Sequence, residues 1–234
     1  MIWLGIDTAN SPLSVAIVKD DVLLIEESSM MKVNHSLRAM PAVEEACRKA
    51  DITPSDIDAI AVSEGPGSYT GVRIGVTIAK TLAWTLKKPL YGVSSLKALA
   101  MNGQLYTGLI CSLIDARRSN VYAGVYRAEG SDLANVLEDQ HCALADLLGQ
   151  LRDYNEPVLF VGEDVKIHKA MICEHLGEQA QFVSFVMNVP RASSAILLAQ
   201  QTEEAETVHT FTPQYKRITE AEANLAKKES SHES

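Results

Sequence analysis

The residue best placed for chemistry near the start of the chain is Asp7, which ends the apolar stretch 2–6. An aspartate at the carboxyl end of a central strand lies where an open α/β sheet binds a ligand or a metal ion. The turn that follows, Thr8-Ala9-Asn10, contains no glycine, so the Cβ of Ala9 hinders close approach of a phosphate. Two interpretations remain open, and we favour the first: Asp7 caps its own turn, or it belongs to a nucleotide site.

A second candidate is the glycine loop, which we define as residues 63–71, Ser-Glu-Gly-Pro-Gly-Ser-Tyr-Thr-Gly. Two glycines around a proline interrupt both strands and helices, and Ser68 or Thr70 is placed to cap a helix that follows. Free amides at such a helix start can hold an anion, but the loop matches neither G-x-x-x-x-G-K-[ST] nor G-x-G-x-x-G. We therefore favour an architectural role for its glycines.

Residues that could ligate a metal or act as nucleophiles form no recognisable site. No two of the six histidines have the i, i+4 spacing of a helical metal site, and His168, Cys173 and His175 lack a fourth ligand. The pair Arg117-Arg118 fits a solvated turn between strands better than a phosphate site. No G-x-S-x-G elbow surrounds the candidate nucleophiles Ser63, Ser68 and Cys111. The sequence therefore predicts no catalytic residue, no metal ion and no bound cofactor.

The residues after the glycine loop, 71–86, predict a helix that is covered on most of its sides. At 100° per residue its apolar side chains span an arc of about 200°, wider than the stripe that one sheet face buries. Within that arc Gly71, Gly75, Ala79 and Ala83 recur every four residues. Such a ridge of small residues lets another helix approach closely. That second helix belongs either to the same chain or to a partner subunit.

Hydrophobic spacing and turn residues predict a similar order of elements in both halves of the chain. In the first half we expect strands at 2–6, 13–18, 22–27, 57–62 and 90–93, and helices at 35–49, 71–86 and 94–101. In the second half we expect strands at 109–114, 121–126, 133–140 and 158–161, and helices at 144–151, 165–176 and 193–201. The repeat predicts two duplicated α/β lobes of the type βββαβα, at 1–103 and 104–212. A partly disordered tail is expected at 213–234.

Composition narrows the possible partners. The chain has 234 residues, 47% of them hydrophobic, and a net charge of −9. No apolar run approaches the roughly 18 residues of a membrane span, and no basic leader opens the chain, so we expect a cytoplasmic protein without a membrane partner. Four cysteines without a C-x-x-C pair indicate reduced thiols. Because nucleic-acid affinity depends on clustered Lys and Arg, a tRNA contact is expected only through a more basic partner.

Four stretches together resemble the TsaB (YeaZ) family of the bacterial tRNA threonylcarbamoyladenosine (t6A) machinery. They are I-D-T-A at 6–9, G-P-G-S-Y-T-G-V-R-I-G at 65–75, I-D-A-R at 114–117 and P-Q-Y-K-R at 213–217. The resemblance covers nearly the whole chain, and the second stretch is its most specific part. It implies the two-lobed actin-like ATPase (ASKHA, ribonuclease H-like) fold. It also implies a non-catalytic subunit that binds and supports the catalytic subunit TsaD, while TsaE and ATP act on the pair to modify N6 of adenosine 37 in tRNA.

One departure from the related catalytic subunit bears on activity. The resemblance implies that TsaD carries an H-x-x-x-H metal motif in the segment that corresponds to 93–99. Here Ser95 and Leu99 stand in place of the two histidines, and a leucine cannot ligate a metal. The departure favours a non-catalytic scaffold. The alternative is a metal- or ATP-dependent enzyme of the same superfamily, such as a glycoprotease-like peptidase.

The helices at 71–86 and 35–49 are the expected partner interface within the N-terminal lobe. Without the partner, the same self-complementary surface could form a twofold homodimer. The residues predicted to contact TsaD are Gly71, Val72, Gly75, Val76, Ala79, Leu82, Ala83, His35, Met40, Val43 and Cys47.

Overall fold

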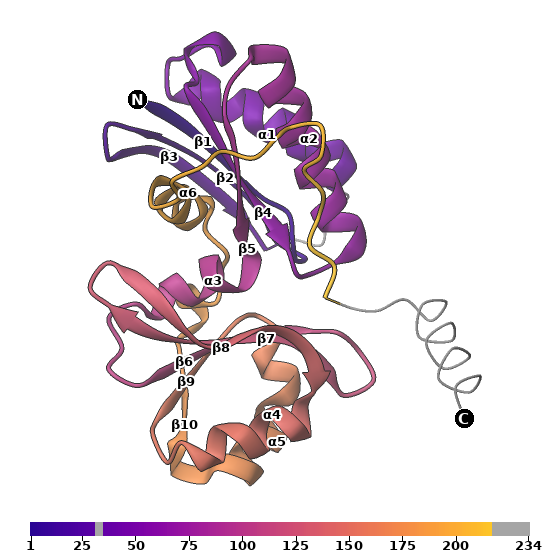
Figure 1. Cartoon of the computed structure of the whole chain (residues 1–234), viewed down its shortest axis with the longest axis vertical. Coiled ribbons are helices and arrows are strands. Elements are labelled where there is room, and N and C mark those ends of the chain that lie inside the picture. The colour runs from indigo at the N-terminus through magenta and orange to yellow at the C-terminus, as the bar shows by residue number, and fades with distance from the viewer. Residues whose placement is uncertain (31–34, 217–234) are drawn as a thin grey trace, which may run out of the picture.

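The computed structural model describes residues 1–30 and 35–216, and these residues form two five-stranded sheets with helices on their faces (Figure 1). Residues 31–34 and 217–234 lie outside the described part. The tail predicted at 213–234 is therefore described only as far as Lys216, and its disorder stays a prediction.

The first sheet is built by the first 94 residues and has the strand order β3-β2-β1-β4-β5. Strands β1 to β3 form an antiparallel meander, while β4 and β5 continue the sheet in parallel to β1. The elements of this half are β1 (Ile2–Asp7), β2 (Leu13–Lys19), β3 (Val22–Ser29), α1 (His35–Lys49), η1 (Pro54–Asp56), β4 (Ala59–Gly65), α2 (Tyr69–Leu86), β5 (Leu90–Ser94), α3 (Ser95–Ala100) and η2 (Met101–Gly103).

The second sheet repeats this topology, with the order β10-β9-β6-β7-β8. Its elements are β6 (Leu109–Asp115), β7 (Asn120–Glu129), β8 (Asp132–Ala143), α4 (Leu144–Asp153), β9 (Val158–Val161), α5 (Val165–Leu176), η3 (Gly177–Gln179), β10 (Ala180–Phe182), η4 (Phe185–Met187) and α6 (Ala192–Gln200). The predicted duplication is confirmed. Each half runs βββαβαβα, one strand and one helix more than the predicted unit, although the expected elements already included the strand at 90–93 and the helices at 94–101 and 193–201. Among the strands only β10 was not predicted, because three residues are too few to show a strand period.

Every residue of the central strand β1 is buried, because helices cover both faces of the first sheet. Alternate side chains such as Leu4 and Ile6 pack with α1 and α2 on one face, and Trp3 packs with α6 on the other. A Cβ built on Gly5 would lie 2.5 Å from the Ala192 carbonyl oxygen, so this glycine lets α6 approach the strand. The continuous apolar run of β1 thus reflects burial on both faces.

The two halves exchange one helix each. Helix α3 follows the first sheet in the chain but packs on β6 and β7 of the second, whereas α6 follows the second sheet and packs on β1, β2 and β4 of the first. The last described residues also return to the first half, where Phe211 is buried in the core beside α2. The predicted lobe boundaries at 103 and 212 divide the chain by sequence order alone, so they place α6 in the half whose sheet it does not cover. These boundaries stay a prediction.

We predict that Gly5→Ala lowers the free energy of unfolding by about 1–3 kcal/mol, because the new methyl group forces α6 away from the sheet. Urea unfolding of the full chain measures the change. Gly149→Ala in α4 is the matched control, since no atom lies within 4 Å of its built Cβ. This control should be neutral or up to about 1 kcal/mol more stable. Equal unfolding midpoints for Gly5→Ala and the parent chain would contradict the packing argument.

Candidate functional site

The glycine loop joins β4 to α2, and the amides of Gly65, Ser68 and Gly71 donate hydrogen bonds inside the chain. Ser68 is the cap of α2: its Oγ accepts a hydrogen bond from the Gly71 backbone at 3.3 Å. The backbone N–H of Ser68 donates to the Ala9 carbonyl at 2.7 Å. Capping by Ser68 is one of the two predicted possibilities, and Thr70 lies within the helix. Amides that already have acceptors at this helix start are poorly available to a phosphate.

Three glycines of the loop and of α2 allow the turn after β1 to sit directly against them. Built Cβ atoms would lie 2.1 Å from the Ala9 carbonyl oxygen at Gly67, 2.2 Å from the Thr8 carbonyl oxygen at Gly71, and 2.4 Å from Thr8 Oγ1 at Gly75. The Thr8 hydroxyl donates to the Gly71 carbonyl at 2.7 Å. The architectural interpretation of these glycines agrees with this geometry.

Asp7 is 2% exposed, and both of its carboxylate oxygens accept hydrogen bonds. Oδ1 accepts from the Ala9 backbone at 2.9 Å, which closes the turn, and Oδ2 accepts from Ser63 Oγ at 2.8 Å, which ties β1 to β4. Burial raises the pKa of this carboxyl, and the two hydrogen bonds oppose the shift. These contacts fit the turn-capping interpretation.

The ridge of small residues on α2 faces the core of its own chain. Gly71, Gly75, Ala79 and Ala83 are buried against the first sheet and the turn after β1. Of the two alternatives that the sequence left open, the burial of these residues favours contact within the chain, where α2 packs on β4, on β1 and on the neighbouring helix α1. The same burial applies to the predicted interface residues Val72, Val76, Val43 and Cys47.

Other apolar side chains of α1 and α2 remain accessible to a partner. The two helices lie side by side on one face of the first sheet (Figure 1). The predicted interface residues His35, Met40 and Leu82 are half-buried on this pair. Residues that the sequence interpretation did not assign to the interface add to the surface: Ile74 and Ile78 are half-buried, while Leu37 is 71% exposed and Trp84 is 66% exposed. A tryptophan outside the apolar arc of α2 was the signal that could have identified this surface.

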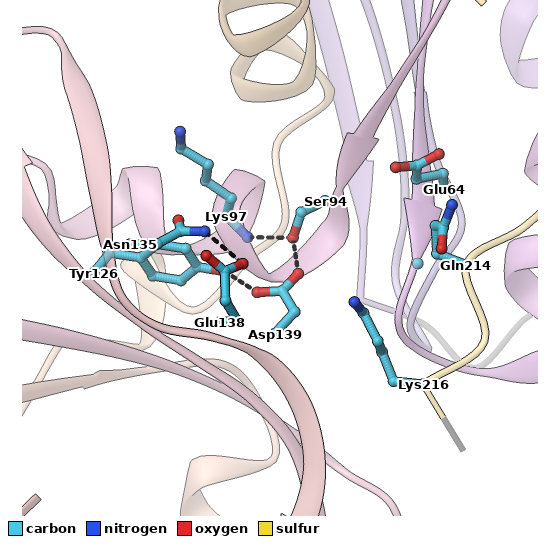
Figure 2. A pocket seen from close by; sticks show the side chains of 10 residues that line it. Glu64, Ser94, Lys97, Tyr126, Asn135, Glu138, Asp139, Gln214 and Lys216 are labelled. Atoms are coloured by element: carbon cyan, nitrogen blue, oxygen red, sulfur yellow. Dashed lines mark hydrogen bonds between the residues drawn. The ribbon is translucent and has the colours of Figure 1, made fainter. Parts of the chain in front are cut away.

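The inter-sheet pocket lies where the two halves meet, and Figure 2 shows its polar side chains facing one another. Its volume is about 190 Å³, below the roughly 300–1,000 Å³ typical of small-molecule sites. None of its residues was a predicted site residue, because β5, β8 and the C-terminal segment come together only in three dimensions. The lining residues are Glu64, Gly65, Ser94, Lys97, Tyr126, Asn135, Glu138, Asp139, Gln214 and Lys216.

Asp139 of β8 connects the halves through this pocket. It accepts hydrogen bonds from Ser94 Oγ at the end of β5 and from the Tyr126 hydroxyl of β7. Ser94 also caps α3 by accepting from the Lys97 backbone at 3.0 Å. Burial raises the pKa of Asp139 above its ordinary value, against the effect of these two donors. The pKa of Tyr126 is raised well above its ordinary value, first by burial and then by the charge of Asp139.

Glu64 faces this group from the first half, and its backbone carbonyl accepts from the Gln214 N–H at 2.8 Å. Burial raises the pKa of Glu64 to about 7; Glu206 and Asp139 add to the shift, and Lys216 opposes it. The side chain therefore changes charge near neutral pH. Within the described residues, the hydrogen bond between Ser94 and Asp139 joins the two halves across this pocket.

The residues considered as metal ligands do not converge. His168 Nε2 lies 3.0 Å from Asp115 Oδ1, whereas His175 Nδ1 lies 2.9 Å from the Met171 carbonyl oxygen. A search of the described residues found no group of three His, Cys, Asp or Glu side chains that could hold a metal ion.

The two residues at the positions of the expected histidine pair serve packing. Ser95 Oγ accepts from the Gly65 backbone at 3.0 Å, and Leu99 is buried between the halves. Arg117 and Arg118 lie with positive φ in the turn between β6 and β7. Among the described residues no helix is both long enough and apolar enough to cross a membrane.

Comparisons with solved structures first identify the fold class. The chain shares the fold of a ROK hexokinase from Thermus thermophilus with a TM-score of 0.51 at 11% identity, covering 86% of this chain and 100% of that one. The duplicated α/β topology is thus that of the actin-like ATPases. A solved structure of YeaZ from Pseudomonas aeruginosa fits better, with a TM-score of 0.74 at 22% identity over 92% of this chain and 99% of that one.

Sequence comparison then identifies the family. A family model described as "TsaD: tRNA N6-adenosine threonylcarbamoyltransferase" matches residues 29–227. The Bacillus subtilis (strain 168) protein named tRNA threonylcarbamoyladenosine biosynthesis protein TsaB is 45% identical over 223 residues, which cover 95% of this chain and 97% of that protein. The chain belongs to the TsaB (YeaZ) family.

We predict that Glu64→Gln raises the stability of the chain at pH 8. The pKa of Glu64 is raised from 4.5 to about 7 in the folded protein. Stability from the protonated carboxyl is therefore complete below pH 4.5 and is lost as the pH rises through 7. A neutral glutamine avoids that loss, so the variant should exceed the parent chain by about 1–3 kcal/mol at pH 8 and match it near pH 4.5.

Urea unfolding at both pH values measures this difference. Glu174→Gln removes an exposed carboxyl of α5 and serves as the control for charge removal. A Glu64→Gln variant whose stability relative to the parent is the same at both pH values would contradict the argument.

Proposed function

We propose that this chain is a non-catalytic subunit of bacterial t6A biosynthesis that binds the catalytic subunit TsaD through α1 and α2. In this proposal TsaE and ATP act on the heterodimer, and tRNA is reached only through the complex. Membership of the TsaB family supports a role in t6A biosynthesis, since the B. subtilis relative is named for that process. The single observation that supports the docking face is that apolar side chains of both helices remain accessible, namely Leu37, Met40, Ile74, Ile78, Leu82 and Trp84.

The role of the glycine loop in this proposal is structural support for that face. The contacts of Gly67, Gly71 and Gly75 with the turn after β1 fix α2 against the first sheet. A rigidly held helix pair loses little conformational entropy on binding, which favours association. The buried residues of the predicted interface would then support the docking surface from below, while half-buried His35, Met40 and Leu82 would contact TsaD.

The non-catalytic part of the proposal rests on how the candidate groups are used. One oxygen of Asp7 accepts from the turn and the other from Ser63 of β4, and Ser95 and Leu99 take the positions of the histidine pair. At the start of α2, Ser68 accepts from the Gly71 backbone and donates to the Ala9 carbonyl. The net charge of −9 supports an indirect tRNA contact. An isolated chain could cover the same apolar face by forming a twofold homodimer.

We predict that Ile78→Asp weakens binding to TsaD by at least about 10-fold, because a carboxylate at a dehydrated apolar contact has no partner. The affinity is measured by isothermal titration calorimetry with purified TsaD. Ile167→Asp on α5 is the matched control, since Ile167 is 59% exposed on the other half of the chain. Melting temperatures of both variants report folding. Unchanged TsaD affinity in a folded Ile78→Asp variant would exclude this face.

We predict that Asp7→Asn retains the t6A-forming activity of the reconstituted complex to within about threefold. The asparagine oxygen can still accept from Ala9, and its amide group can donate to the Ser63 hydroxyl, so the turn survives the substitution. The readout is threonylcarbamoyl transfer to tRNA in the presence of TsaD, TsaE and ATP. A folded variant that binds TsaD normally but supports no modification would make Asp7 a functional group.

A further inference from the structure

A second accessible surface lies on the side of the molecule that α6 covers, away from α1 and α2 (Figure 1). There, η2 and the residues after it, η4 and the first two turns of α6 enclose the hinge groove, a hollow of about 520 Å³. The residues that line the hinge groove are Met101, Asn102, Gly103, Gln104, Leu105, Tyr106, Leu159, Met187, Arg191, Ser193, Ser194 and Leu197.

Hydrogen bonds fix both sides of the hinge groove. The Asn102 side-chain amide donates to the carbonyl oxygens of Met187 at 2.8 Å and Val189 at 2.9 Å, which fixes the segment after η4 beside η2. At the start of α6, the Ala192 N–H donates to Ser14 Oγ at 2.9 Å. Because these bonds fix both sides, the groove is formed before any partner arrives.

Large apolar side chains stand out from the segments that form the hinge groove. Leu105 is 91% exposed, Phe185 84%, Val186 51% and Leu197 36%. Single exposed apolar residues are common, but a group of them around one hollow is typical of an interaction site. Nothing within the described residues covers Leu105 or Phe185.

The charge around the hinge groove favours a partner with a negatively charged group. The lining contains one charged residue, Arg191, and no Asp or Glu, in a chain with 30 acidic and 21 basic residues. Arg191 is exposed, and its guanidinium has no hydrogen bond or ion pair with any described residue. The carboxylate that contacts the first turn of α6, Glu26, accepts from the backbone and hydroxyl of Ser193. A carboxylate entering the groove would thus find a free guanidinium that can bind it in a bidentate manner.

Gln104 adds a requirement for a hydrogen-bond donor. Its Oε1 atom is buried and has no partner among the described residues. A buried acceptor without a partner is unfavourable, so a turn of the Gln104 side chain that brings Oε1 to an N–H group of a ligand is favoured. A peptide backbone supplies such a group next to its side chains.

We propose that the hinge groove docks an extended segment of a partner protein in which apolar side chains precede a carboxylate. The apolar side chains cover Leu105 and Leu197, the carboxylate pairs with Arg191, and a backbone N–H of the segment donates to Gln104. This surface is separate from the α1–α2 face, so a chain bound to TsaD through that face keeps the groove accessible.

The test titrates the full ¹⁵N-labelled chain by NMR with acetylated and amidated tripeptides. The probe is Leu-Phe-Glu, and the comparisons are Leu-Phe-Lys, which reverses the charge, and Ser-Ser-Glu, which lacks the apolar part. Leu-Phe-Glu should shift the amide signals of 101–106 and 185–197, with at least about fivefold higher affinity than either comparison peptide.

Variants separate the charge from the apolar contact. Arg191→Gln should reduce the preference for Leu-Phe-Glu over Leu-Phe-Lys to less than about twofold, and Leu105→Ser should weaken both peptides about equally. The matched controls are Arg152→Gln on α4 and Ile167→Ser on α5, both exposed positions that should leave every affinity unchanged. The same spectra report whether each variant is folded.

Several outcomes would overturn the proposal. Equal binding of the glutamate and lysine peptides would remove the role of charge, and no shifts at several-millimolar peptide would remove the site. Shifts of groove amides that grow with protein concentration alone would assign the groove to a second copy of this chain. Co-sedimentation with phosphatidylglycerol vesicles that Leu105→Ser abolishes would assign it to a lipid surface.

Discussion

The close contact between the glycine loop and the turn after β1 is the constraint on which the first half of the molecule depends. Gly67 and Gly71 would bring a Cβ to within 2.2 Å of carbonyl oxygens of that turn, so a larger residue at either position would separate α2 from the sheet. The backbone of the turn donates a hydrogen bond to the Asp7 carboxylate, and α2 buries its small residues over β1 and β4. The most specific sequence block of the family is therefore explained by packing within the chain. The same packing fixes the direction in which Ile74, Ile78 and Trp84 point from α2.

The second constraint is the way in which the halves hold each other. Helices α3 and α6 each pack on the sheet of the opposite half, and Asp139 accepts hydrogen bonds from Ser94 across the junction. A polar contact of this kind is strong only while it is shielded from water. The same junction holds Glu64, whose pKa of about 7 makes the stability of the junction depend on pH near neutrality.

The two accessible surfaces of the chain have different characters. The α1–α2 face carries accessible apolar side chains on two helices that pack on the core of the first half. The hinge groove is smaller and combines exposed apolar side chains with a single unpaired cation, Arg191, which suits a short anionic segment. Helices α1 and α2 cover one face of the first sheet and α6 covers the other, so the two surfaces lie on different sides of the molecule.

The sequence by itself determined the α/β class, the duplication and the family, because hydrophobic periodicity and the block at 65–75 are local signals. It limited the cap of α2 to Ser68 or Thr70, and the structure selects Ser68. It also predicted that Asp7 caps its turn, since the residues that it binds include its neighbour two positions on. Local signals do not report which neighbour covers a buried face. The ridge of Gly71, Gly75, Ala79 and Ala83 has the same spacing whether a partner or the chain's own sheet lies against it, and only the tertiary structure places it inside. The inter-sheet pocket and the hinge groove were beyond prediction for the same reason: their residues come from strands and helices far apart in the chain, and the exchange of α3 and α6 brings them together.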